Sequence, residues 1–170
     1  MFTTTASRSG RKRTSSGSSS GAIVQIINTE TGAVATGATT IPVDDTIPQN
    51  TEGTEFMTLA ITPTDANNTL RIDVVCNLTG ANLTIWLIAA LFQDSTANAL
   101  AVGMAFTETN TAGFTVVFSY YMIAGTTSST TFKVRAGSNA GATVTFNGQG
   151  GARLFGGVLL SSITITEIAA

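Results

Sequence analysis

The chain contains no histidine, one cysteine (Cys76) and three prolines among its 170 residues. Histidine is the side chain that titrates nearest neutral pH, and it is a frequent general base and metal ligand. A single cysteine cannot form a disulfide within the chain. These absences argue against an enzyme, and we expect no catalytic residue, no cofactor and no bound metal.

Charge is also scarce. Charged residues make up 11% of the chain, against about 25% in an average soluble domain, and hydrophobic residues make up 43%. The surface must therefore consist largely of Thr, Ser, Asn and Gly, or be covered by another chain. A chain of this length is expected to form one domain with a core of its own.

No hydrophobic run is long enough for a membrane helix. The longest, residues 83–92 (LTIWLIAALF), has ten residues, about half of what a transmembrane helix requires. The basic N-terminal stretch is followed by TSSGSSSG at residues 14–21, where a secretory signal would need an apolar core. We therefore expect synthesis in the cytoplasm and no membrane partner.

The basic residues are unevenly distributed. Four of the eight, Arg8, Arg11, Lys12 and Arg13, precede the first acidic residue, so residues 1–20 carry a charge of +4 and residues 21–170 carry −6. Residues 1–21 are otherwise rich in Ser, Thr and Gly and cannot bury enough apolar surface to offset the entropy of ordering. We predict a basic arm that orders only against a partner, with a protein surface favoured over nucleic acid.

From residue 22 onward, short runs of β-branched and aromatic residues alternate with turn-forming Gly, Asn, Asp and Pro. This spacing is typical of an all-β sandwich, and no helix-period segment exceeds two turns. We predict one domain over residues 22–170 with strands at residues 22–27, 39–43, 56–61, 69–76, 83–92, 99–106, 114–122, 130–136, 143–146 and 161–168.

Alternation within the runs indicates which faces are buried. Residues 70–76 alternate, and Cys76 shares its face with leucine, isoleucine and valine, so we predict a buried, unreactive thiol. Residues 83–92 and 114–122 are apolar on both faces, so their outer faces need cover. We predict that another subunit supplies it, through an interface formed by Ile85, Trp86, Leu87, Ile88, Phe92, Phe118 and Tyr120.

Two further patterns carry weak chemical signals. The stretch NGQGGARLFGG at residues 147–157 is rich in glycine but has Arg153 where a dinucleotide-binding fingerprint needs glycine, and we interpret it as a turn. Four carboxylates, Asp44, Asp45, Glu52 and Glu55, lie close together in sequence. A solvated loop is favoured over a calcium site, and a hydrolytic pair is the least favoured interpretation.

Four stretches carry a resemblance to a known group of proteins: residues 21–64, 91–102, 124–137 and 151–170, the last reading GARLFGGVLLSSITITEIAA. They resemble a domain that recurs in structural and tail-fibre-type proteins of tailed bacteriophages, and the resemblance covers nearly all of residues 21–170. It implies an all-β jelly-roll sandwich, similar in outline to tumour-necrosis-factor-like knobs, that assembles as a homotrimer on the virion. It implies no catalytic residue.

The resemblance and the basic arm together suggest a structural virion protein, made in the host cytoplasm and located in the virion. We expect a trimeric capsid decoration or a head- or tail-fibre component. Arg8, Arg11, Lys12 and Arg13 would anchor it to a capsid, portal or tail protein. The alternative is a receptor-binding module at a fibre tip that recognises a host surface glycan through the polar loops 107–113 and 138–142.

Overall fold

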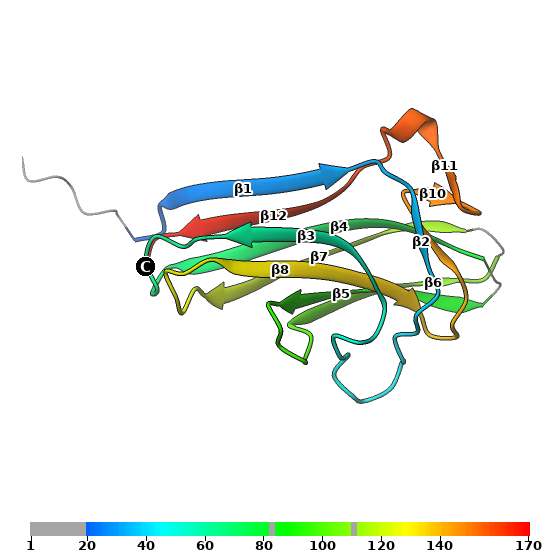
Figure 1. Ribbon diagram of the computed structural model, residues 1–170, viewed down its shortest axis with the longest axis horizontal. Helices are drawn as coiled ribbons and strands as arrows, with labels where there is room; N and C mark the ends of the chain where they lie inside the picture. Colours follow the sequence, from blue (N-terminus) through cyan, green and yellow to red (C-terminus); the bar gives the residue numbers. More distant parts are fainter. Residues whose placement is uncertain (1–19, 82–83, 110–111) are drawn as a thin grey trace, which may run out of the picture.

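The computed structural model describes residues 20–81, 84–109 and 112–170, which form a sandwich of two antiparallel β-sheets (Figure 1). Sheet I contains, in spatial order, β1 (Ile23–Thr31), β12 (Ser161–Ile168), β4 (Thr69–Gly80) and β7 (Gly113–Ile123). Sheet II contains β3 (Thr54–Ile61), β8 (Thr130–Ser138), β5 (Ile85–Gln93) and β6 (Ala101–Thr107).

Shorter elements complete the described part of the chain. Strand β9 (Val144–Phe146) pairs with the end of β4 and with β2 (Ala35–Gly37) in sheet I. Strands β10 (Gly148–Gln149) and β11 (Ala152–Arg153) form a hairpin, followed by the 3-10 helix η1 (Phe155–Gly157).

The pairing of the eight long strands defines a jelly roll. In chain order the first pairs with the last (β1 with β12), the second with the seventh (β3 with β8), the third with the sixth (β4 with β7), and the fourth with the fifth (β5 with β6). This nesting folds a long hairpin into two sheets of antiparallel strands, which is the jelly-roll arrangement. The predicted all-β jelly-roll sandwich is confirmed; the basic residues of the arm, 8–13, lie outside the described residues.

The predicted strand runs coincide with strands of the structure except at residues 39–43. After β2 these residues leave sheet I and cross the outer face of sheet II. Ile41 donates its amide to Ser138 O at 3.0 Å, but Pro42 has no amide to donate, and no ladder forms. Ile41 is fully buried, so its apolar pattern reflects burial without strand pairing.

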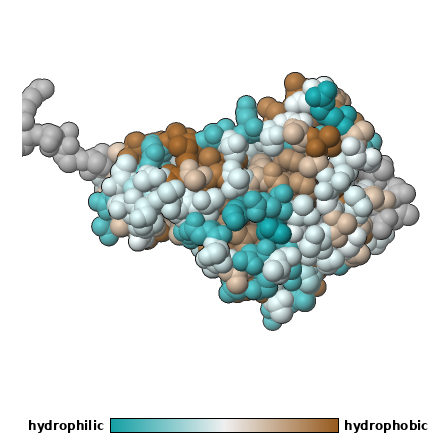
Figure 2. Space-filling model, viewed as in Figure 1, coloured by the Kyte–Doolittle hydropathy of each residue, from teal (hydrophilic) through white to brown (hydrophobic). Residues whose placement is uncertain are grey.

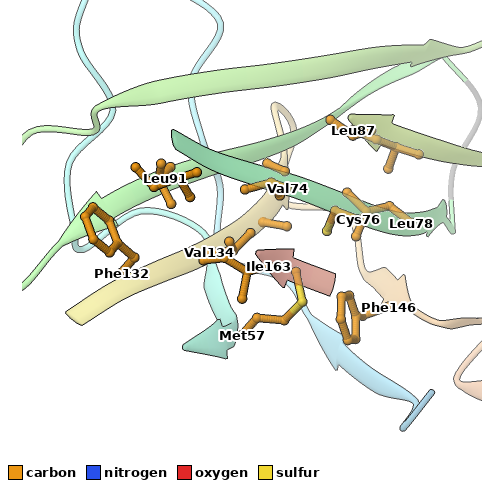
Figure 3. Close-up of a cluster of buried hydrophobic side chains, with 14 of the residues drawn as sticks. Met57, Val74, Cys76, Leu78, Leu87, Leu91, Phe132, Val134, Phe146 and Ile163 are labelled. Atoms are coloured by element: carbon orange, nitrogen blue, oxygen red, sulfur yellow. The ribbon is translucent and has the colours of Figure 1, made fainter. Parts of the chain in front are cut away.

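The core lies between the sheets and is built from their inward-facing side chains (Figure 3). Cys76 of β4 is one of them, and its burial raises the pKa of the thiol to about 12. The thiol is therefore protonated at neutral pH, as the alternation predicted. The rings of Phe56 and Phe146 stack at a centroid separation of 4.9 Å and extend the core toward β9.

One end of the sandwich is organised by a buried carboxylate, Glu167 of β12. Its Oε1 accepts hydrogen bonds from Asn68 Nδ2 at 2.6 Å and from both the amide and the hydroxyl of Thr64 at 2.8 Å, and its Oε2 accepts one from Gln25 Nε2 at 2.6 Å. Burial alone would raise the pKa of Glu167, but the bonds from Asn68, Gln25 and Thr64 outweigh it and lower the pKa to about 2. The charged carboxylate thus joins β1 and β12 to the loop between β3 and β4.

This network predicts a pH-dependent stability. The pKa of Glu167 is lower in the folded chain than the ordinary value of 4.5, so its contribution is complete above pH 4.5 and is lost as the pH falls toward 2. A shift of this size corresponds to about 3 kcal/mol in the free energy of unfolding. Glu167→Gln replaces a carboxylate, which only accepts hydrogen bonds, with an amide whose NH2 group would face the donors of Asn68, Thr64 and Gln25. Urea unfolding should show it to be less stable at pH 7, with the difference narrowing steadily below pH 4.5; a constant difference down to pH 2 would contradict this assignment.

Candidate interaction surfaces

Four of the predicted interface residues are buried within a single chain. Ile85 and Leu87 face the core between the sheets, whereas Ile88 and Phe92 lie on the outer face of sheet II, and each is at most 3% exposed. They offer no surface to a second chain. Strand β5 is covered on both faces, as its apolar pattern predicts, but the cover comes from the same chain and not from another subunit.

The chain covers the outer face of β5 itself. Residues 38–53 cross sheet II, and Ile41 packs with Ile88, Ala90 and Phe92 in a second hydrophobic cluster. The crossing is close, because a Cβ atom on Gly137 would lie 2.3 Å from the backbone oxygen of Thr39. Sequence alternation can show that a strand face is covered, but it does not identify the covering segment.

The acidic residues of the same segment have structural partners or lie in solvent. Arg135 Nη1 lies 3.5 Å from Glu55 Oε2, and Arg135 also donates to the backbone oxygen of Glu52 at 2.8 Å. Asp44 accepts bonds from the hydroxyl and amide of Thr46, which lower the pKa of Asp44. Within the described ranges, no group of three potential metal-ligating side chains occurs.

The remaining predicted interface residues lie near the side of the sandwich where β6 and β7 meet. Phe118 and Tyr120 of β7 are half-buried beside the core, and half-buried Trp86 packs against Phe106 at a centroid separation of 4.8 Å. Gly103 of β6 permits the close approach of the two strands, since a Cβ atom there would lie 2.6 Å from the Phe118 ring. Phe118, Tyr120 and Trp86 are therefore at least partly accessible.

The β6–β7 side is apolar and carries no charged side chain in either strand. Both are edge strands, each paired on one side only. They hold seven of the fifteen exposed large hydrophobic residues of the described chain: Val102, Met104, Phe106, Phe114, Val117, Tyr121 and Ile123. Soluble proteins usually protect exposed edge strands with charges or proline, and neither is present in these two strands. Val102, Met104 and Phe106 lie on the outer face of sheet II, and Val117, Tyr121 and Ile123 lie on the outer face of sheet I, so exposed apolar surface lies on both sides of the two edges.

The outer face of sheet I adjoins this side and is also poor in charge. Side chains that are neighbours on adjacent strands form rows across β1, β12, β4 and β7. One such row contains Ile26, Thr166, Arg71 and Tyr121. Figure 2 shows hydrophobic surface over the beginning of β1, where Ile23 and Ile26 are 62% and 57% exposed. On this face β12 presents Ser162, Thr164 and Thr166, which lie beside Val75, Asp73 and Arg71 of β4.

One ion pair lies in the middle of this face. Arg71 contacts Asp73 at 2.9 Å, and Asp73 also accepts a bond from the hydroxyl of Ser119 at 2.5 Å. The Arg71 guanidinium lies 5.8 Å from the centre of the Tyr121 ring. Both charges therefore have partners on the same face, which lowers the cost of covering it.

The glycine-rich stretch, residues 147–157, forms the β10–β11 hairpin and η1. The three residues of η1 are too few to present the helix N-terminus that a phosphate-binding loop requires. Across the described ranges, no helix is long and apolar enough to cross a membrane.

Comparisons with known proteins add a likeness in outline. No protein-family model and no curated protein matches the chain significantly. Among solved structures, Eiger TNF from S. frugiperda is similar with a TM-score of 0.46 and 9% sequence identity, over 85% of this chain and 93% of that chain. The jelly-roll assignment rests on the strand pairing described above.

The intrachain cover of β5 can be tested by truncation. Ile88→Ala removes a side chain that is 2% exposed and should lower the free energy of unfolding by about 2–5 kcal/mol. Met104→Ala on neighbouring β6 is the control, because Met104 is 56% exposed and its loss should have little effect on the isolated chain. Urea unfolding at the lowest workable concentration measures both, and equal losses would contradict the assignment.

Proposed function

We propose that this protein is a structural virion protein of a tailed bacteriophage. In this proposal three copies of the jelly roll associate into a capsid decoration or a head- or tail-fibre component, and the basic arm anchors it to a capsid, portal or tail protein. The observation that carries the proposal is the uncharged, apolar β6–β7 side, which a soluble monomer would leave facing water. The viral context comes from the sequence resemblance.

Copies of the same chain are the simplest partners for this side. The outer face of sheet I offers an extended, charge-poor surface on the same molecule, with Thr164 and Thr166 of β12 beside Arg71 of β4. A β6–β7 side that packs on sheet I of the next copy makes a heterologous contact, and three such contacts close a ring. Each Å² of apolar surface that is covered contributes about 25 cal/mol.

The positions of the chain ends support a tethered arrangement. The first described residues and the C-terminus lie at one end of the sandwich (Figure 1), where Gly21 donates its amide to Ala169 O at 2.8 Å. The last residues of β4, β6 and β8 lie at the opposite end. An arm bound to a virion surface would therefore hold one end of the body there and direct the other end outward.

Trimer formation is tested by the mass of the full chain. Light scattering should give about three times 17.4 kDa at two concentrations. Val117→Glu puts a charge on the β6–β7 side and should shift the mass to that of a monomer, because a buried unpaired carboxylate is costly. Thr58→Glu, at an exposed position on edge strand β3, is the matched control and should stay trimeric. A wild-type monomer at both concentrations would refute the trimer.

Anchoring by the arm is tested separately. Replacing Arg8, Arg11, Lys12 and Arg13 together with alanine should leave the solution mass unchanged, because the proposed contacts between copies lie in the jelly roll. The same variant should be lost from purified virions, as measured by quantitative mass spectrometry. Normal incorporation would contradict the anchoring role.

The alternative proposal is a receptor- or glycan-binding module at a fibre tip. Residues 107–109, 112–113 and 138–142 lie at the ends of β6, β7 and β8 that are opposite the first described residues, and residues 110–111 of the first loop lie outside the described residues. The second loop is fixed by hydrogen bonds from Ser138 Oγ to Ala142 O and from the Trp86 amide to Asn139 Oδ1. Binding of the isolated trimer to host cells, competed by their surface glycan, favours this alternative; tight virion association without cell binding favours the structural role.

A further inference from the structure

A protruding apolar segment, residues 153–160, overlaps the end of the glycine-rich stretch and leads into β12. We call this segment the knob. Phe155 and Val158 are 73% and 77% exposed, the highest values among the large hydrophobic residues described. Figure 2 shows hydrophobic surface in this region, beside β10 and β11. Phe155 has φ of +48°, a left-handed conformation that is unfavourable for a bulky residue. A strained backbone that presents exposed aromatic surface suggests a docking element.

The base of the knob is firmly held. Asn77 Nδ2 donates to Leu160 O at 2.7 Å, and Ser161 Oγ donates to Asn147 Oδ1 at 2.6 Å. Asn147 in turn donates to Thr31 O at 2.7 Å, which joins the base to the end of β1. A knob with a fixed base loses less conformational entropy on binding than a loose loop would.

A groove of complementary character lies on the outer face of sheet II. It runs between residues 41–48 and β6, as two adjoining hollows of about 400 and 260 Å³. Val43, Ile47, Val102 and Met104 give it apolar walls. These four side chains are between 42% and 56% exposed, so in a single chain the groove faces solvent.

Charge is complementary as well. Asp44 and Asp45 line the groove, and neither forms an ion pair with any described residue. Arg153, at the start of the knob, likewise has no ion-pair partner in the described part of the chain. An apolar knob with one cation matches an apolar groove with two carboxylates.

The knob and the groove belong to opposite faces of the sandwich. The knob lies beyond sheet I, near the end of β1 (Figure 1), and the groove lies on the outer face of sheet II. They cannot meet within one chain. We propose that the knob of one copy binds in the groove of another copy, with Phe155 and Val158 against Val102 and Met104 and with Arg153 beside Asp44 and Asp45. This contact rests on the proposed self-association and specifies which segment of the next copy covers Val102 and Met104 of the β6–β7 side.

The test is cross-linking of a full-length double variant, Phe155→Cys with Met104→Cys. Cys76 does not compete, because it is fully buried and its thiol has a raised pKa. A short bismaleimide should join separate chains into dimers and larger species on a denaturing gel. The matched control, Ile23→Cys with Met104→Cys, carries an equally accessible thiol at the far end of β1 and should remain monomeric on the gel.

A charge exchange gives a second readout. In the cross-linking background, Arg153→Asp should reduce the cross-linked fraction, and combining it with Asp44→Arg and Asp45→Arg should restore it. Cross-linking no greater than in the Ile23 control, in a protein that light scattering shows to be trimeric, would overturn the knob contact and leave the proposed function intact. A wild-type chain that is monomeric at both concentrations would instead refute the self-association itself.

Discussion

A strand in a two-sheet sandwich has two faces, and only one of them can face the core. The other face must be polar, or something must cover it. This chain has few charges with which to make the second face polar, since charged residues are 11% of the total. Each outer face and each edge strand of the sandwich must therefore be polar, be covered by the chain itself, or remain exposed. Which of these applies at each place determines the architecture and the surfaces left for partners.

The two sheets meet this requirement differently. Over β5 the chain covers its own strand with residues 38–53, and Ile41 completes a small second core. Across the centre of sheet I the outer face is satisfied by threonine, serine and the Arg71–Asp73 ion pair. At the β6–β7 side neither solution is used, so apolar side chains remain exposed. That difference is the physical basis for proposing association between copies.

Much of the fold could be predicted from residue patterns. The β-branched runs located the long strands, and alternation placed Cys76 in the core, because both depend on neighbours in the chain. Residues 39–43 have the apolar pattern of a strand because they cross sheet II, and the burial of Ile41 against that sheet produces the same pattern as pairing in a sheet. Strand β2 was missed, since Ala35–Gly37 has little β propensity and is positioned by β9.

The surfaces were harder to predict than the strands. Ile85, Leu87, Ile88 and Phe92 have the composition of an interface, but tertiary contacts bury them inside one chain. Glu167 sits in the alternating pattern of β12 as an apparent exception, and only the folded chain brings Asn68, Thr64 and Gln25 around it. The knob could have been suspected from Phe155 and Val158 within a glycine-rich stretch, but its complement on β6 and residues 41–48 depends on the tertiary fold.

The most direct test of the central claim is hydrogen–deuterium exchange of the full chain, compared with its Val117→Glu variant. Strands β1 and β7 are both edges of sheet I and provide an internal comparison. If copies cover the β6–β7 side, the amides of β7 that do not pair with β4 will exchange slowly in the wild-type chain and faster in the variant, which is expected to be monomeric. The free edge of β1 will change less. Equal exchange of β7 in the two proteins would contradict the account.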